Sequence, residues 1–186
     1  MQIWMITAVA VGLSGMAQAQ TIDAKTAKKA LFSPVKAEVE ILSAAGLPRD
    51  QAKVLRSVGV AQLYYGAIAI SPELGLMAET TVAAANYHDV AAASVAALVG
   101  CNAAKAGAKD CAVAALIRPK GWKDTGLSLS SDATAGFRAA DPASGSAMAI
   151  SAGSGAWGIG ADAEGAIAAC VARNPDANDC AAVIAN

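Results

Sequence analysis

Two pairs of cysteines with the same spacing constrain this chain more than any other feature. Cys101 and Cys111 enclose nine residues, and so do Cys170 and Cys180. In each pair the first cysteine ends an alanine-rich stretch, and the second follows an aspartate and begins a short apolar run. A fixed order of matched features is typical of an internal repeat. We therefore predict that two copies of one folding unit make up most of the chain.

A strand-like segment precedes each cysteine pair and supports this interpretation. Residues 66–71 and 146–151 have similar sequences and lie 80 positions apart, whereas the cysteines of the two pairs lie 69 positions apart. We infer that the first copy carries an insertion between this segment and its first cysteine.

Four cysteines can pair in three ways, and independent closure of each copy selects Cys101–Cys111 and Cys170–Cys180. Zinc ligands and redox-active thiols are the alternatives, but both usually have the closer Cys-x-x-Cys spacing. We favour structural disulfides, because an even number of cysteines suits an exported protein in an oxidising compartment.

The first nineteen residues have the pattern of a secretory signal peptide. A short apolar run (3–15) is followed by Ala17-Gln18-Ala19, so we expect cleavage before Gln20. An uncleaved membrane anchor is the alternative, but the run is short and interrupted for a membrane span. We expect a periplasmic or secreted protein with no stable membrane anchor after cleavage.

The periodicity of apolar residues divides the mature chain into four parts. These are an N-terminal part with a flexible arm, a strand and a short helix (20–60), repeat 1 (61–123), a connector with one helix (124–141) and repeat 2 (142–186). Each repeat has the predicted order strand, strand, helix, strand. The predicted fold class is α+β, with two β-β-α-β repeats packed as a mixed sheet covered by alanine-rich helices.

The Gly-x-x-Ala-x-Ser hairpin, the alanine-rich helix ending in cysteine and the Asp-Cys strand resemble a family of small secreted bacterial domains of unknown function. Residues 64–66, 86–88 and 118–122 are also similar to a narrower group of exported bacterial proteins. The resemblance covers most of residues 60–186. It implies secretion and a disulfide-stabilised β-β-α-β unit, and it implies no particular activity.

His88 is the only histidine in the chain. A Ser-His-Asp hydrolase would need it as the general base, but no G-x-S-x-G segment presents a serine nucleophile. We expect His88 at the start of a helix instead.

Gly153–Gly158 matches G-x-G-x-x-G, but strand residues follow it, so we expect a hairpin turn and no cofactor or metal.

The strongest binding candidate is a basic cluster in which Arg118, Lys120 and Lys123 surround Trp122. A cation beside an aromatic ring can hold an anionic group or a glycan by charge and stacking. An exposed loop above a packed tryptophan is the simpler interpretation, and we favour it. The net charge of −1 creates no field that attracts nucleic acid.

These features favour an exported, non-enzymatic protein used for binding or as an envelope component. Its expected partner is an envelope or secreted protein, or a small anionic ligand. The candidate ligand-binding residues are Arg118, Lys120, Trp122 and His88. The alternatives are a small periplasmic hydrolase using His88 and an inhibitor of a secreted enzyme.

Overall fold

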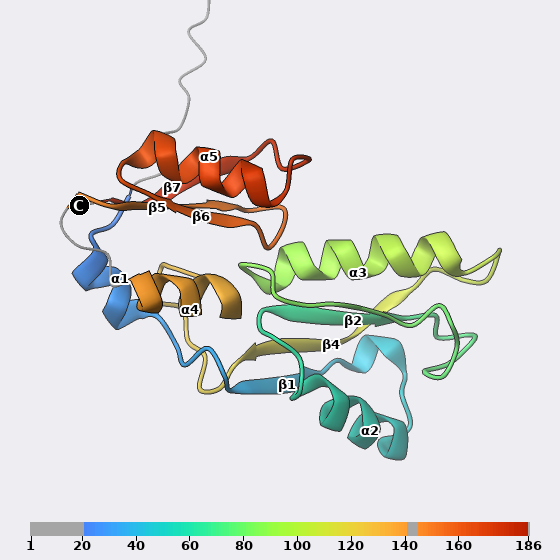
Figure 1. Ribbon diagram of the computed structural model, residues 1–186. Helices are drawn as coiled ribbons and strands as arrows, with labels where there is room; N and C mark the ends of the chain where they lie inside the picture. Colours follow the sequence, from blue (N-terminus) through green and yellow to red (C-terminus); the bar gives the residue numbers. More distant parts are fainter. Residues whose placement is uncertain (1–20, 141–144, 186) are drawn as a thin grey trace, which may run out of the picture.

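The structure is a computed structural model that describes residues 21–140 and 145–185. The predicted signal peptide and its cleavage site lie outside the described residues. Two groups of elements have the predicted order strand, strand, helix, strand (Figure 1). Unit 1 consists of β2 (Gly66–Ile70), β3 (Val82–Ala84), α3 (Val90–Ala104) and β4 (Ala112–Pro119). Unit 2 consists of β5 (Ala147–Ser151), β6 (Trp157–Gly160), α5 (Ala163–Arg173) and β7 (Cys180–Ala185).

Five further elements complete the described fold outside these units. The N-terminal part contains α1 (Ala24–Ala30), β1 (Ala37–Ile41), the short 3₁₀ helix η1 (Ser43–Ala45) and α2 (Arg49–Gly59), and the connector contains α4 (Ser131–Ala140). The predicted α+β class is confirmed, with helices packed on sheets.

The strands form two antiparallel sheets and not one mixed sheet. Sheet 1 has the order β1-β4-β2-β3, and sheet 2 has the order β6-β5-β7. In each unit the first strand is central, with its hairpin partner on one side and the last strand of the unit on the other. The three strands of each unit therefore lie in one sheet, and β1 adds a fourth strand to the sheet of unit 1. A parallel contact occurs only as an isolated bridge between Ile22 and Ile184 in the described chain.

The central strands of the two units share an irregularity as well as a position. The register between β2 and β4 shifts between Ile68 and Ala69, and the register between β5 and β7 shifts between Met148 and Ala149. These two places match when residues 66–70 are aligned with residues 146–150.

Small side chains bring one helix close to each sheet. In unit 1, Ala93 and Ala97 of α3 pack on Ala67 and Ala69 of β2. In unit 2, α5 lies so close to β6 that a Cβ atom on Gly158 would overlap the α5 backbone. Figure 1 shows α3 and α5 on the same side of their respective sheets.

Larger side chains fill the opposite face of each sheet. Beneath sheet 1, Leu55 of α2 packs with Ile68 and Ile117. Beneath sheet 2, Phe137 of α4 packs with Met148, and Ala24 and Ala27 of α1 join the same cluster. The core of unit 2 therefore contains residues from the N-terminal part and the connector.

Two segments differ from the prediction. The residues expected to form a flexible arm contain α1, which Asp23 caps by accepting a hydrogen bond from the Thr26 amide at 2.9 Å. Only two small residues of α1 face the core, which is too weak a pattern to predict a helix. The second strand of unit 1, expected directly after a turn at residues 71–75 and through about Ala85, covers only Val82–Ala84, because residues 71–81 form a loop in which Gly75 has a φ of +83°.

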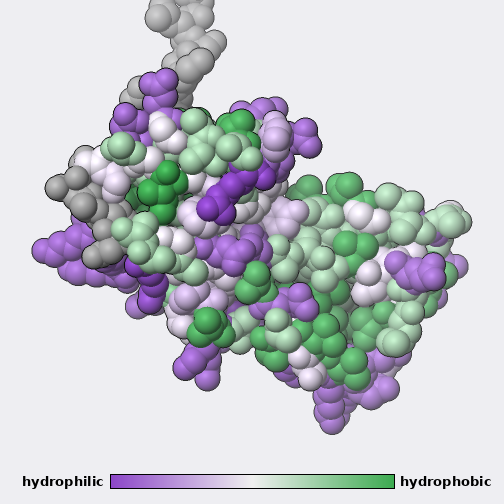
Figure 2. Space-filling view, viewed as in Figure 1, coloured by the Kyte–Doolittle hydropathy of each residue, from purple (hydrophilic) through white to green (hydrophobic). Residues whose placement is uncertain are grey.

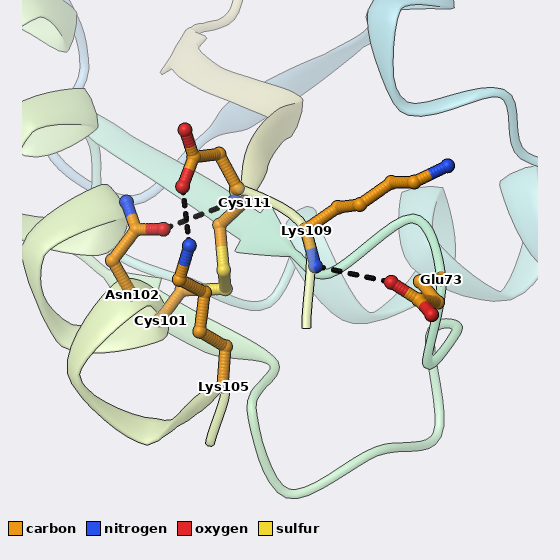
Figure 3. Close-up of polar contacts among 7 residues, drawn as sticks. Glu73, Cys101, Asn102, Lys105, Lys109 and Cys111 are labelled. Atoms are coloured by element: carbon orange, nitrogen blue, oxygen red, sulfur yellow. Dashed lines mark hydrogen bonds and ion pairs between the residues drawn. A yellow bond between two sulfur atoms is a disulfide. The ribbon is translucent and has the colours of Figure 1, made fainter. Parts of the chain in front are cut away.

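Both predicted disulfides are present. Cys101–Cys111 and Cys170–Cys180 have Cα–Cα distances of 6.1 and 6.2 Å. Each bridge ties the C-terminal part of a helix to the segment that begins the next strand. Around the first bridge, the side chain of Asn102 accepts a hydrogen bond from the Cys111 amide, and Lys105 pairs with Asp110 (Figure 3).

Candidate functional site

A groove between the two units is the candidate site. It has a volume of about 520 Å³, and its walls come from the segment before α3, the start of α4, the β5–β6 turn and the end of α5. In Figure 1 these elements meet where the two lobes of the molecule join. Ligand sites often lie at such junctions, because separate elements can supply converging polar groups.

Arg173 and Trp157 form the wall that belongs to unit 2. The guanidinium carbon of Arg173 lies 3.6 Å from the centroid of the Trp157 ring. The indole is held in turn by α4, where Gly136 lies so close that a Cβ atom would overlap the ring. Stacking on the indole fixes the position of the Arg173 guanidinium. Among the described residues no carboxylate pairs with Arg173, so its hydrogen-bond donors stay available.

Asn86 and Asp132 form the opposite wall. The Asn86 amide nitrogen donates to Oδ2 of Asp132 at 2.8 Å, and Oδ1 of Asn86 accepts from the Asp132 backbone amide at 3.1 Å. Asn86 has a φ of +65°, which non-glycine residues rarely adopt. Its carbonyl approaches Gly155 so closely that only a glycine fits there. This wall is therefore rigid, and Asp132 keeps acceptor capacity toward the groove.

His88 lies behind this wall and is only 2% exposed. Its Nδ1 atom accepts a hydrogen bond from the Ser130 amide at 3.1 Å, so Nε2 carries the proton and donates to the Ala156 carbonyl at 2.9 Å. Burial lowers the pKa of His88 from its ordinary value. Both ring nitrogens bind backbone groups, so neither is available to activate a serine, and this geometry does not support the hydrolase alternative.

The predicted start of the helix beside His88 is confirmed. Asp89 caps α3, because its side chain accepts a hydrogen bond from the Ala92 amide at 2.7 Å. The segment with the G-x-G-x-x-G pattern forms the turn of the β5–β6 hairpin and the start of β6, as predicted.

The predicted basic cluster lies toward the β1 edge of sheet 1, at the end of β4. Arg118 of β4 stacks on Trp122 at 4.9 Å from the ring centroid, and it forms an ion pair with Glu40 of β1. A hollow of about 420 Å³ beside this pair is also lined by Glu38, while Lys120 is exposed in the turn after β4. The two glutamates oppose the positive charge, which makes the hollow a weaker anion site than the groove.

The sequence did not single out Arg173 with Trp157. The two residues belong to different elements, and only the close packing of α5 on β6 brings them together. The stacked pair in unit 1 gave no guide to it, because Arg118 and Trp122 lie in and just after β4, whereas Trp157 begins β6 and Arg173 ends α5.

Two features are absent from the described residues. No group of three or more metal-ligating side chains converges there. No helix within the described ranges is long and apolar enough to cross a membrane.

The chain was compared with protein-family models, with curated proteins and with solved structures. None of the three comparisons gave a match.

Proposed function

We propose that the chain is an exported, disulfide-stabilised binding protein made of two copies of one β-β-α-β unit, related to the secreted bacterial domains that it resembles. The common strand order, the common register shift and the two equivalent disulfides support the duplication. The signal-peptide pattern and the disulfides support export to the periplasm or the medium. Sequencing of the mature N-terminus tests the export, with Gln20 as the expected first residue.

The proposed binding site is the groove between the units, and its ligand is a small anionic molecule that also carries hydrogen-bond donors. The stacked guanidinium of Arg173 is the observation that carries this proposal, since it lacks a carboxylate partner in the described chain and faces a concave surface. A guanidinium fork binds a carboxylate or phosphate through two parallel hydrogen bonds. The acceptor capacity of Asp132 on the opposite wall suits hydroxyl or ammonium donors of the same molecule.

Binding without catalysis fits the same geometry. His88, the one histidine, is occupied by backbone groups on both sides. The groove itself presents hydrogen-bonding groups and an aromatic ring held in place, which is the composition of a recognition site.

Nuclear magnetic resonance can test this proposal with defined probes. The indole N–H resonance of Trp157 is followed while citrate, galacturonate or inorganic phosphate is added. We expect at least one of these anions to shift this resonance with a Kd of about 1 mM or lower. Arg173→Gln should abolish the shift, because the neutral amide cannot form the charged, two-bonded contact.

Arg118→Gln is the matched control, since it removes the other guanidinium that stacks on a tryptophan. It should leave the Trp157 response unchanged. A response centred on Trp122, or a Trp157 response that persists in Arg173→Gln, contradicts the proposed site. Absence of any response to all three anions contradicts the proposed ligand class.

A further inference from the structure

The face of sheet 2 that packs against α4 has an equivalent in sheet 1. In β6, Ile159 pairs with Met148, and in β3, Ala83 pairs with Ile68. Met148 and Ile68 hold the same place in their central strands, so Ala83 corresponds to Ile159. Thr81 lies two residues before Ala83, and Trp157 lies two residues before Ile159. By the same alignment, Thr81 therefore corresponds to Trp157.

In unit 2 this place is covered by a helix of the chain itself. Trp157 and Ile159 pack into the cluster that Phe137 of α4 fills. The contact is close, since Gly136 of α4 lies directly against the indole ring. A short amphipathic helix is therefore the natural cover for this face of the fold.

In unit 1 no described helix covers the equivalent place. α2 lies beneath β1 and β4, and the small side chains of Thr81 and Ala83 leave a groove of about 300 Å³ beside it. Val54 and Val58 line one side of this groove, and Met77 lines it from the loop before β3. Met77 is 90% exposed, and the two valines are 52% and 49% exposed. In Figure 2 hydrophobic surface is more extensive on the lobe that contains sheet 1.

We propose that this groove is a docking site for one amphipathic helix of another protein, which lies under β3 as α4 lies under β6. Because Thr81 and Ala83 are small, the docking helix must bring large apolar side chains such as leucine or phenylalanine. Grooves of this kind read a helix through apolar residues spaced three and four positions apart. The long, flexible side chain of Met77 can adapt to such residues at low cost.

The exposed area favours a single helix over a second copy of this chain. Val54, Val58 and Met77 together expose roughly 300 Å² of apolar surface, whereas a stable dimer buries about 800 Å² on each partner. One helix presenting two or three large side chains covers an area of this size. The protein should therefore remain a monomer when no helix is bound.

A stapled peptide provides a defined probe. It has about 12 residues, forms a stable helix and carries leucine and phenylalanine on one face with lysine and glutamate elsewhere. Fluorescence anisotropy should show binding to the full chain with a Kd of about 100 μM or lower. Val58→Glu and Met77→Glu should each weaken binding about tenfold or more, because they place a charge in the apolar groove.

Two controls distinguish binding at this site from nonspecific hydrophobic binding. Val95→Glu places the same charge on an exposed valine of α3 and should leave binding unchanged. A second peptide has the same composition with its apolar residues spread around the helix, and it should not bind. Circular dichroism melts of all three variants establish that they remain folded.

Several results overturn the proposal. These are no binding of the one-faced helix up to about 1 mM, equal binding of both peptides, or equal weakening by Val95→Glu. Sedimentation measurements that show a dimer, which Val58→Glu dissociates, assign the groove to a second copy of the chain instead.

Discussion

His88 contributes to this fold as a neutral hydrogen-bonding group. It comes from unit 1, accepts from Ser130 of the connector and donates to Ala156 of unit 2. Protonation of Nδ1 would place an N–H donor opposite the Ser130 amide, which is itself a donor, and this hydrogen bond would be lost. The neutral ring is therefore built into the junction of the two units, and burial lowers its pKa because a charged ring would lose its hydration there.

The stability of the protein should consequently fall in mild acid. Because the folded-state pKa lies below the ordinary value of 6.5, the contribution of His88 is complete above that value. It is lost as the pH falls from there through the folded-state pKa. The nearby charges of Asp89 and Asp179 act in the opposite direction and reduce the effect. Urea unfolding at about pH 7.5 and about pH 5.5 measures the difference.

His88→Gln is the comparison variant for this experiment. It should lower the free energy of unfolding by about 2 kcal/mol at neutral pH, because glutamine does not reproduce both buried hydrogen bonds. Its stability should vary less between the two pH values than that of the native protein. An equal pH dependence in both proteins assigns the acid sensitivity to other groups.

At the scale of the elements, the distance between each helix and its sheet depends on glycine and alanine residues. Gly158 and Gly160 of β6 face α5, and a Cβ atom on either would overlap the α5 backbone. Ala166 of α5 is fully buried against the same sheet. Closer approach of this kind lets a helix with little apolar area make extensive van der Waals contact.

Gly158→Ala should therefore destabilise the protein by about 3 kcal/mol, since backbone atoms of α5 would have to move. Gly153→Ala in the β5–β6 turn is the control, because its Cβ would meet only the end of the Asp179 side chain, at 3.3 Å. That variant should lose less than about 1 kcal/mol. Chemical denaturation measures both values, and equal losses would contradict close helix–sheet packing.

The elements that the sequence predicted have strong local patterns. The alternation of Glu38 and Glu40 with apolar neighbours marked β1, and the alanine-rich stretch before Cys101 marked α3. α1 and the true length of β3 were not predictable, because tertiary contacts select them. The groove was missed for the same reason, since Arg173 meets Trp157 only after α5 has packed on β6.

At the scale of the whole molecule, the chain crosses between its two sheets more than once. α1 belongs to the N-terminal part but packs beneath sheet 2, where Ile22 also bridges to Ile184. The connector binds unit 1 directly, because Tyr64 and Ser131 exchange two hydrogen bonds, of 3.0 and 2.8 Å. The two disulfides, in contrast, each close within one unit.

These shared contacts should make the two units unfold together. If the rest of the chain unfolded, the core of unit 2 would lose Phe137, Leu129 and the alanines of α1. The apolar area left in unit 2 would then be too small for independent stability. Two tryptophans in the described residues allow a direct test, since Trp122 follows the last strand of unit 1 and Trp157 begins β6 of unit 2. Trp157→Phe leaves a reporter on unit 1, and Trp122→Phe leaves a reporter on unit 2.

In the protein that begins at residue 20, each variant should show the same urea midpoint by tryptophan fluorescence and by far-ultraviolet circular dichroism. Coincident midpoints mean that the local environment of the reporter and the total secondary structure are lost in one transition. Trp157→Phe will shift both midpoints to lower urea, because it removes part of the core and the stacking partner of Arg173. The comparison is therefore made within each variant. If the Trp122→Phe variant lost its fluorescence signal well before its helices, unit 2 would be an independent domain, and the junction around His88 would not couple the two sheets.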